Sequence, residues 1–395
     1  MRVFTCTPKR FVGDPSHFAR ESGLFSVGLS LIGVKSRAIM PGPPMDGDDP
    51  RLLRTDYSNL ESKEWWESLK LDGLILYSWA APRYNRIVEA ASRAGIKVLA
   101  NMDTSGVVSP LACRSEWLRE AHVPVVHGDM NPLRKGVELA KLVVELATHR
   151  VSRGRLRHYA AASVISACTP HAAIWIPNEA IRLGRSDLAE KFVYLPHPQM
   201  KAFRYDGSIK EPLVISVGRW HQADWGQKNP RVLLKAYASF LEQMPGWKGM
   251  IVGAGASDLP RLLGFDVGRT SNRLSFLEHM PAAELPKLYQ RARIGFWSSR
   301  WEGQQGTGAQ ALCCGCTVVA PFSAQNSCFR HYVSRASGRL AWRNEPSALA
   351  LELVLEARAW EAGYRDPEQI GSAWSQEFHA DAVAARALRE LGLVA

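Results

Sequence analysis

The strongest indication of the fold is the sequence SSRWEGQQGTGAQ, residues 298–310. It follows the apolar run IGFW at residues 294–297 and leads into ALCCGCTVVA at residues 311–320. An apolar strand, a glycine-rich loop, a helix and a second apolar strand make up one unit of a parallel α/β sheet. Ligands of such sheets bind where the strands end, and a helix start offers backbone N–H groups to phosphate. The stretch therefore predicts a phosphate-binding edge of a parallel sheet.

The same alternation continues on both sides of this stretch. We expect strands in the second half at residues 213–217, 249–252, 274–277, 294–297 and 317–320. In the first half we expect strands at residues 2–6, 36–40, 73–79, 97–102, 163–167 and 191–195, with helices such as 83–94 and 132–147 between them. The pattern predicts an α/β protein of two Rossmann-like doubly wound domains that face an interdomain cleft.

A polar segment separates the two expected domains. Residues 198–212 contain Pro198, Gly207 and Pro212, which favour an irregular connection. We therefore expect a first domain at residues 1–198, a linker at 199–212 and a second domain at 213–375. The final helix, residues 376–395, is a candidate to pack back on the first domain.

Composition restricts the class of protein. The 395 residues include no apolar run long enough to span a bilayer and no signal-peptide layout at the start, so we expect a cytoplasmic protein. Seven cysteines, an odd number, argue against a disulfide framework. Cys313, Cys314 and Cys316 lack metal-site spacing and are interpreted as small packing residues. We expect no metal site.

The net charge of +11 indicates anionic ligands. The basic residues are spread over both halves and form no nucleic-acid motif, so we expect phosphorylated ligands and no nucleic acid. Peripheral attachment to the anionic inner face of a membrane stays open, because no amphipathic basic helix stands out in the sequence.

Two cations follow the first strand of the second half. Gly218 and Arg219 come directly after residues 213–217, and Lys228 precedes the start of the next helix. Cations at such a junction suit a diphosphate, and the helix start adds oriented N–H groups. The alternative is that both cations are ordinary solvated surface charges.

Glycines follow two further strands. Gly253 and Gly255 permit close backbone approach to a ligand, although a tight turn would use the same residues. In the loop after residue 297 we expect phosphate contacts from Gly303, Gln304, Gln305 and Gly306. Glu302 is placed to accept hydrogen bonds from sugar hydroxyls; the alternative roles are a helix-dipole partner or a loop cap.

Together these residues resemble the retaining GT-B glycosyltransferases of family four. That family has Gly-Arg after the first strand of its C-terminal domain, then a Lys, a Gly-x-Gly and two glutamates separated by seven residues. Residues 314–319 also match its Cys-Gly and apolar strand. The resemblance implies a hexosyltransferase-like enzyme that retains configuration, with a nucleotide-diphosphate sugar (UDP or GDP) as co-substrate and no cofactor.

The resemblance also implies roles for single residues. Arg219 and Lys228 would hold the donor diphosphate, Glu302 would contact the transferred sugar, and the segment around His279 would contact the base. The second family glutamate, which binds the ribose, falls on Gln310. A glutamine still accepts a hydrogen bond through its amide oxygen but lacks the charge.

The first half follows the family pattern less closely. Gly13 lies where the family usually has a glycine pair. Asp103 follows the strand at residues 97–102, where the family places a histidine near the transferred sugar. The sequence Asp-Thr-Ser-Gly at residues 103–106 also suits a plain turn. His171 and His197 are interpreted as structural.

These residues predict how the reaction is stabilised. Glycosyl transfer passes through an oxocarbenium-like state, and fixed cations stabilise the departing diphosphate. Because no acidic Asp-x-Asp pair stands at a plausible place, we expect metal-independent transfer. The acceptor (glycan, lipid-linked saccharide or small molecule) and the oligomeric state stay open. The alternatives are a degenerate GT-B protein that binds nucleotide sugar without turnover, and an epimerase or phosphorylase of the same fold.

Overall fold

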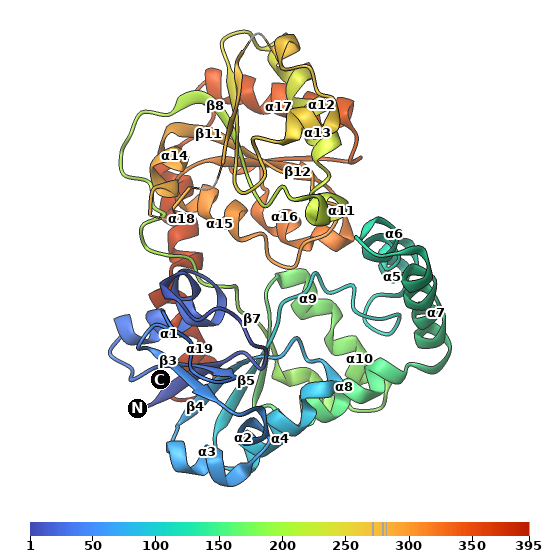
Figure 1. The fold of residues 1–395 in the computed structure, drawn as a ribbon, viewed down its shortest axis with the longest axis vertical. Helices are drawn as coiled ribbons and strands as arrows, with labels where there is room; N and C mark the ends of the chain where they lie inside the picture. Colours follow the sequence, from blue (N-terminus) through green and yellow to red (C-terminus); the bar gives the residue numbers. More distant parts are fainter. Residues whose placement is uncertain (271, 279, 282, 395) are drawn as a thin grey trace. The chain divides into compact units, whose positions relative to one another are not determined.

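Short apolar runs form the strands of two separate parallel sheets. A computed structural model describes residues 1–270, 272–278, 280–281 and 283–394. The chain divides into unit 1, residues 1–119, 141–200 and 377–395, and unit 2, residues 120–140 and 201–376 (Figure 1). Each unit is built around one of the two sheets.

Unit 1 contains a seven-stranded parallel sheet in the order β3-β2-β1-β4-β5-β6-β7. Its strands are β1 (Val3–Cys6), β2 (Ala38–Pro41), β3 (Leu52–Thr55), β4 (Gly73–Tyr77), β5 (Lys97–Met102), β6 (Val164–Ala167) and β7 (Phe192–Tyr194). The helices of unit 1 are α1 (Glu21–Leu31), α2 (Tyr57–Leu60), α3 (Lys63–Leu69), α4 (Asn85–Arg93), α8 (Arg150–Ala161), α9 (Pro170–Trp175), α10 (Pro177–Arg182) and α19 (Ala380–Glu390). Three further helices, α5 (Arg114–Glu120), α6 (Val123–His127) and α7 (Pro132–Thr148), lie in the segment where the chain leaves and re-enters unit 1.

The strands of unit 1 are buried on both faces, which explains their nearly continuous apolar sequences. Successive residues of β5 point to opposite faces: Val98 packs in the cluster with α4 and α8, and Leu99 packs in the cluster with α1 and α19. The C-terminal helix α19 thus belongs to the core of unit 1. The backbone of Gln199 pairs with that of His379 next to it.

Unit 2 contains a six-stranded parallel sheet in the order β10-β9-β8-β11-β12-β13. Its strands are β8 (Glu211–Val217), β9 (Lys248–Val252), β10 (Leu274–Leu277), β11 (Ala292–Phe296), β12 (Thr317–Pro321) and β13 (Gly338–Ala341). Its helices are α11 (Trp225–Lys228), α12 (Pro230–Gln243), α13 (Leu259–Leu263), α14 (Leu285–Arg291), α15 (Gly306–Cys313), α16 (Ser327–Tyr332), α17 (Pro346–Glu361) and α18 (Pro367–Phe378), whose last residues reach unit 1.

The expected strands all form, and two more join them. Strands β3 and β13, which the sequence analysis does not predict, lie at the edge of each sheet. Each has four residues and includes an arginine, so its apolar pattern is too short to stand out from a loop. Residues 120–140, expected within the first domain, group with unit 2. There a Cβ on Gly226 would lie 1.8 Å from the carbonyl oxygen of His127.

The composition predicts cysteines without a disulfide framework and no membrane-spanning segment, and the structure can be compared with both expectations. All seven cysteines are buried as free thiols, and burial raises the pKa of the Cys313 thiol well above its usual range. They pack in the core, as the sequence analysis expects for Cys313, Cys314 and Cys316. Among the described residues, none of the helices combines the length and the apolarity that crossing a bilayer requires.

Two helical glycines test whether the packing of α19 on α1 contributes to stability. A Cβ on Gly28 of α1 would lie 2.1 Å from the carbonyl oxygen of Ala380, whereas a Cβ on Gly136 of α7 would meet nothing within 4 Å. We expect Gly28→Ala to lower the free energy of unfolding by about 1–3 kcal/mol through overpacking. Gly136→Ala should raise it by about 0.5–1 kcal/mol through helix propensity. Urea unfolding of both variants checks this. Equal changes of the same sign in the free energy of unfolding would contradict the close contact between Gly28 and Ala380.

Candidate active site

The glycine-rich loop of unit 2 lies at the carboxyl end of its sheet. Strand β11 ends just before this loop, and α15 begins at Gly306 directly after it. The Thr307 hydroxyl in the first turn of α15 donates to the carbonyl oxygen of Val217, the last residue of β8 (3.3 Å). The indole N–H of Trp297 donates to the same carbonyl (3.2 Å). The ends of β8 and β11 and the start of α15 therefore meet at one point, where parallel sheets bind ligands.

Lys228 and Glu302 form a buried ion pair at this edge. The Lys228 Nζ donates to Glu302 Oε1 at 2.6 Å, and both side chains are less than a tenth exposed. The amide of Gln227 donates to Glu302 Oε2, and that of Gln305 donates to Oε1, each at 3.1 Å. Both oxygens of the carboxylate thus accept hydrogen bonds. The structure brings together three residues that the sequence analysis names separately, Lys228, Glu302 and Gln305.

Polar residues after β11 hold the Lys228 loop in place. The Ser298 hydroxyl donates to the carbonyl oxygen of Lys228 at 2.9 Å. The Arg300 guanidinium donates to the Gly226 carbonyl and to the side-chain oxygen of Asn229, each at 2.7 Å. Asn229 adopts the left-handed conformation (φ 54°) that ends α11. Desolvation by burial lowers the pKa of Arg300. The sequence analysis assigns no role to Ser298 or Arg300, although both follow a strand end directly.

Arg219 lies in a different environment from Lys228. Its side chain is 69% exposed and forms an ion pair with Asp224 at 3.2 Å. Lys228 is instead enclosed by protein and held by a carboxylate. The two cations that the sequence analysis treats as equivalent therefore differ: Lys228 is buried and paired with Glu302, and Arg219 is exposed at the surface and paired with Asp224.

The Gly-x-Gly loop packs against the Gly218 loop through backbone atoms. Gly253 has φ 127°, and a Cβ there would lie 1.9 Å from the Gly218 carbonyl oxygen. Gly255 has φ 85° and lies against the backbone of Trp220. The Glu278 carboxylate accepts from the backbone N–H of Gly255 at 2.6 Å. The approach of the two loops to each other thus explains Gly253 and Gly255, whereas a Cβ on Gly218 would meet the ring of Trp220 at 3.1 Å. Contacts of these three glycines with a ligand stay a prediction.

The remaining loop and helix residues lie along the start of α15. Gly303 and Gln304 form a bend, Gln305 precedes the helix and Gly306 opens it. Gln310 follows one turn later and is half-buried. The phosphate contacts of the loop and the ribose contact of Gln310 stay predictions. His279, named for the base contact, lies outside the described residues.

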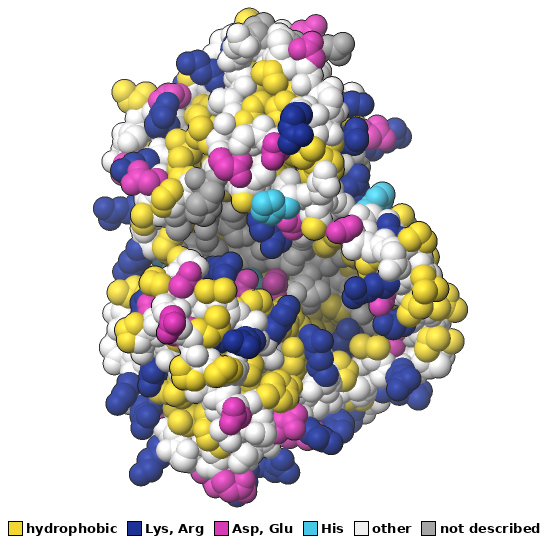
Figure 2. All heavy atoms as spheres, in the orientation of Figure 1, with side chains coloured by type: hydrophobic (Ala, Val, Ile, Leu, Met, Phe, Trp, Pro, Cys, Tyr) yellow, Lys and Arg dark blue, Asp and Glu magenta, His cyan; other side chains and the backbone are white. Residues whose placement is uncertain are grey.

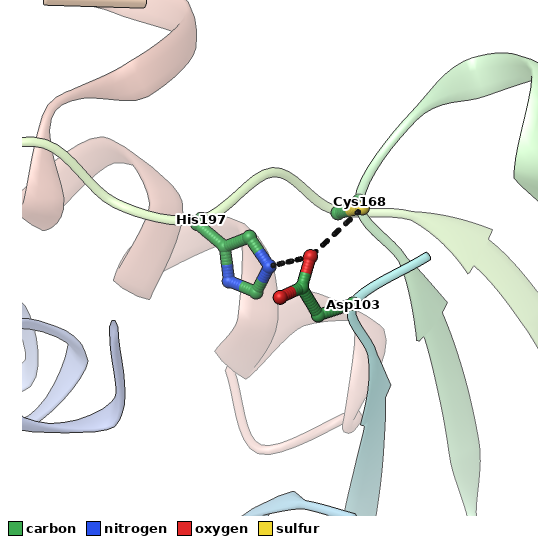
Figure 3. A group of neighbouring side chains, drawn as sticks. All are labelled: Asp103, Cys168 and His197. Atoms are coloured by element: carbon green, nitrogen blue, oxygen red, sulfur yellow. Dashed lines mark hydrogen bonds and ion pairs between the residues drawn. The ribbon is translucent and has the colours of Figure 1, made fainter. Parts of the chain in front are cut away.

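In unit 1, three side chains converge after three neighbouring strands. Figure 3 shows Asp103 after β5, Cys168 after β6 and His197 after β7 pointing toward one another. The Asp103 Oδ1 lies 3.2 Å from His197 Nε2 and 3.8 Å from Cys168 Sγ. The three atoms that could bind a metal lie within 4.8 Å of one another, a ligand set of the kind that zinc accepts. The sequence analysis names Asp103 but interprets His197 as structural; the shared signal is that each residue follows a strand end.

The environment of His197 favours its charged form. Desolvation by burial lowers the pKa of His197, but the nearby Asp103 carboxylate raises it through its charge and its hydrogen bond, so that the net shift is upward. The Tyr77 hydroxyl lies 3.3 Å from His197 Nδ1, and Glu21 adds a further negative charge. His197 thus anchors the Asp103 side chain as one half of an ion pair.

Gly13 lies in the loop after β1. A Cβ there would come within 2.2 Å of the Leu52 side chain and 2.5 Å of Asp48. The Gly13 carbonyl accepts from the backbone N–H of Asp49 at 2.8 Å. Close packing against β3 explains this glycine, and its contribution to a donor site stays a prediction.

Comparisons with known proteins agree with this architecture. Residues 211–354 match a family model described as glycosyl transferases group 1. Among solved structures, Anabaena Alr3699/HepE in complex with UDP matches with a TM-score of 0.66 at 14% identity. The lipopolysaccharide outer core galactosyltransferase WaaB matches with 0.62 at 12%, and sucrose-phosphate synthase from Thermosynechococcus elongatus with 0.60 at 16%. All three matches cover 100% of both chains. A search of curated proteins found no match.

At identities of 12–16%, these solved structures are evidence for the fold alone. They confirm the prediction of two Rossmann-like doubly wound domains of the GT-B type. The sheets have seven and six parallel strands, one more in each than the sequence analysis expects. The matched family covers strands β8 to β13 and the residues of the Lys228–Glu302 pair.

A double-mutant cycle tests the buried pair. We expect Lys228→Met and Glu302→Gln each to lower the free energy of unfolding by about 3–5 kcal/mol, because each leaves one charged or polar partner buried without the other. The double variant should lose less free energy of unfolding than the two single variants lose in sum, with a coupling energy of about 2 kcal/mol. Urea unfolding measures the cycle, and the exposed pair Lys287–Glu284 is the matched control, with an expected coupling below about 0.5 kcal/mol. Strictly additive losses at Lys228 and Glu302 would contradict the pair.

The Asp103–His197 pair predicts a pH dependence. Because the pKa of His197 is raised in the folded state above its usual 6.5, its contribution to stability is fully present below pH 6.5. That contribution is lost as the pH rises through the folded pKa. The destabilisation caused by Asp103→Asn, measured by urea unfolding, should therefore be larger at acidic pH than at alkaline pH. A pH-independent difference would show that His197 is neutral throughout.

Proposed function

We propose that this protein is a glycosyltransferase that moves a sugar from a UDP-sugar to a hydroxyl group of its acceptor. Residues 211–354, which match the family model of glycosyl transferases group 1, support this proposal. The observation that carries the proposal is the buried Lys228–Glu302 pair at the carboxyl edge of the unit 2 sheet, beside the start of α15. A cation, a carboxylate and the backbone N–H groups of a helix start are the recognition elements that a diphosphate sugar needs.

The choice of UDP over GDP rests on a structural neighbour. Solved structures of Anabaena Alr3699/HepE hold UDP, UDP with glucose, and UDP-glucose. These ligands belong to that protein. For this chain they favour uridine as the base to test first.

In the proposed reaction Lys228 stabilises the departing diphosphate. Its ammonium group is held within the protein, so it needs little reorganisation when negative charge develops on the leaving group. Glu302 has a second role: with its oxygens already oriented by Gln227 and Gln305, it accepts hydrogen bonds from hydroxyls of the transferred sugar. Arg219, with its long exposed side chain, closes on the diphosphate after binding.

Asp103 is the residue of unit 1 that we assign to the reaction. A carboxylate held beside the sugar would stabilise the positive charge of the oxocarbenium-like state. The ion pair with His197 orients this carboxylate and balances part of its charge. Retention of configuration, as in the family that the sequence resembles, is part of the proposal, and proton NMR of the new anomeric centre tests it.

The second candidate function is nucleotide-sugar binding without turnover. It is favoured by one observation, the glutamine at position 310 where the family has its ribose-binding glutamate. Release of UDP that requires an added acceptor would support a transferase. UDP-sugar binding without release would support the second candidate, and conversion of the sugar without an acceptor would indicate an epimerase.

Nucleotide binding tests the donor site directly. Calorimetric titration with UDP, GDP and ADP should give the tightest binding for UDP. We expect Lys228→Met to weaken UDP binding at least about tenfold, since a charge-assisted hydrogen bond contributes about 1.5–3 kcal/mol. The exposed Lys287→Met variant is the matched control and should bind UDP as the wild type does.

Two outcomes would decide against the proposal. Undetectable binding of all three nucleotides to the folded wild type would exclude the donor site, and equal binding by Lys228→Met would exclude Lys228 from it. Gln310→Glu gives an independent check of the ribose contact. It should tighten UDP binding about fivefold, because a charged acceptor exceeds a neutral one by about 1 kcal/mol.

A further inference from the structure

Helix α7 presents apolar side chains to solvent instead of to a core. In its seventeen residues, Pro132–Thr148, the one buried side chain is that of Glu145. Leu133, Val137 and Val144 are 80%, 49% and 48% exposed. Their spacing of four and seven residues places them on one face of the helix, together with the exposed Ala140. The helix therefore carries an exposed apolar stripe, which we define as Leu133, Val137, Ala140 and Val144.

A helix of similar length shows the usual alternative. Helix α12 is also amphipathic, but it buries Leu233, Tyr237, Phe240 and Leu241 in the core of unit 2. The apolar stripe of α7 has no such cover. Figure 2 shows hydrophobic side chains gathered over the place where Figure 1 labels α5, α6 and α7. Leu118 of α5 and Val126 of α6 are also exposed, with fractions of 52% and 44%.

The orientation of α7 is set by its one buried residue. Glu145 Oε2 accepts from the backbone N–H of Val151 at 2.7 Å. Its Oε1 accepts from the Ser152 hydroxyl, also at 2.7 Å. An acidic side chain is thus turned inward at the start of α8, while the neighbouring Val144 is turned outward. This arrangement removes a negative charge from the exposed surface.

Cations accompany the apolar stripe. Exposed Arg134 and Lys141 each follow a stripe residue by one position, and exposed Arg150 and Arg153 continue the basic series on α8. Between residues 132 and 153 five cations (Arg134, Lys135, Lys141, Arg150 and Arg153) stand against two acids, Glu138 and the buried Glu145, which leaves a net charge of +3. A helix with an apolar face bordered by Lys and Arg suits the boundary between acyl chains and anionic headgroups.

We propose that α7 docks this protein on an anionic lipid bilayer. The apolar stripe enters the headgroup–acyl boundary, and Arg134 and Lys141 extend alongside it to lipid phosphates. The alternative occupant, a second copy of this chain, is disfavoured because two such faces would bring like charges together. The docking holds whether or not sugar is transferred. If the proposed function also holds, it narrows the acceptor to one presented at a membrane surface.

Vesicle co-sedimentation of the full chain without nucleotide tests this proposal. We expect binding to phosphatidylcholine vesicles with about 30% phosphatidylglycerol and at least about tenfold weaker binding to pure phosphatidylcholine. Leu133→Gln with Val144→Gln should weaken binding to the anionic vesicles at least about tenfold, since both apolar contacts are lost. Arg134→Gln with Lys141→Gln should weaken it and reduce its salt dependence.

Two exposed apolar residues elsewhere are the matched control. Ile209 and Trp342 are 90% and 78% exposed, and Ile209→Gln with Trp342→Gln should leave vesicle binding unchanged. All substituted residues are exposed, and circular dichroism verifies that each variant folds. The proposal is overturned if the wild type does not bind anionic vesicles, or if the stripe variant binds like the wild type. It is also overturned if light scattering shows that the wild type is a dimer and the stripe variant a monomer, while neither protein binds vesicles. UDP titration in the absence of vesicles reports separately on the proposed function.

Discussion

The buried ion pair between Lys228 and Glu302 is the constraint on which the candidate active site depends. Removing two charges from water is costly unless the remaining hydrogen-bonding capacity is satisfied. Gln227 and Gln305 supply those hydrogen bonds, and Arg300 and Ser298 hold the backbone on which Lys228 lies. The pair therefore ties two strand ends and the start of α15 into one rigid arrangement. A site fixed in this way can stabilise a leaving diphosphate with little reorganisation.

The two units use the same principle with different chemistry. Each places polar residues at the carboxyl ends of parallel strands, where backbone groups and helix starts are open to ligands. In unit 2 a lysine is fixed by a carboxylate. In unit 1 a carboxylate, Asp103, is fixed by a histidine whose pKa it raises. Oriented charge thus comes from ion pairs at both sheets, and helix α7 carries a third group of charges beside an apolar face.

Much of the fold and part of the site could be predicted from local sequence. Continuous apolar runs and glycine-rich loops are local signals, so they predict the order of strands and helices. They also indicate Lys228 and Glu302 as candidate site residues, and the structure brings these two side chains together. The strands β3 and β13 could not be predicted, because each has only four residues including an arginine and therefore shows no clear apolar periodicity. The roles of Ser298, Arg300 and His197 could not be predicted either, since each depends on a partner distant in the chain.

The sequence by itself determined the α/β class, the two doubly wound units and the resemblance to the glycosyltransferases. Periodicity and motif order are properties of neighbouring residues, which explains that success. Only the tertiary structure decided which cation is buried, which histidine faces Asp103 and which face of α7 stays exposed. Burial and pairing arise when strand ends far apart in the chain meet. Apolar residues at helical spacing predict a stripe of side chains along one face of a helix. Only packing decides whether that stripe is covered by a core or exposed to solvent.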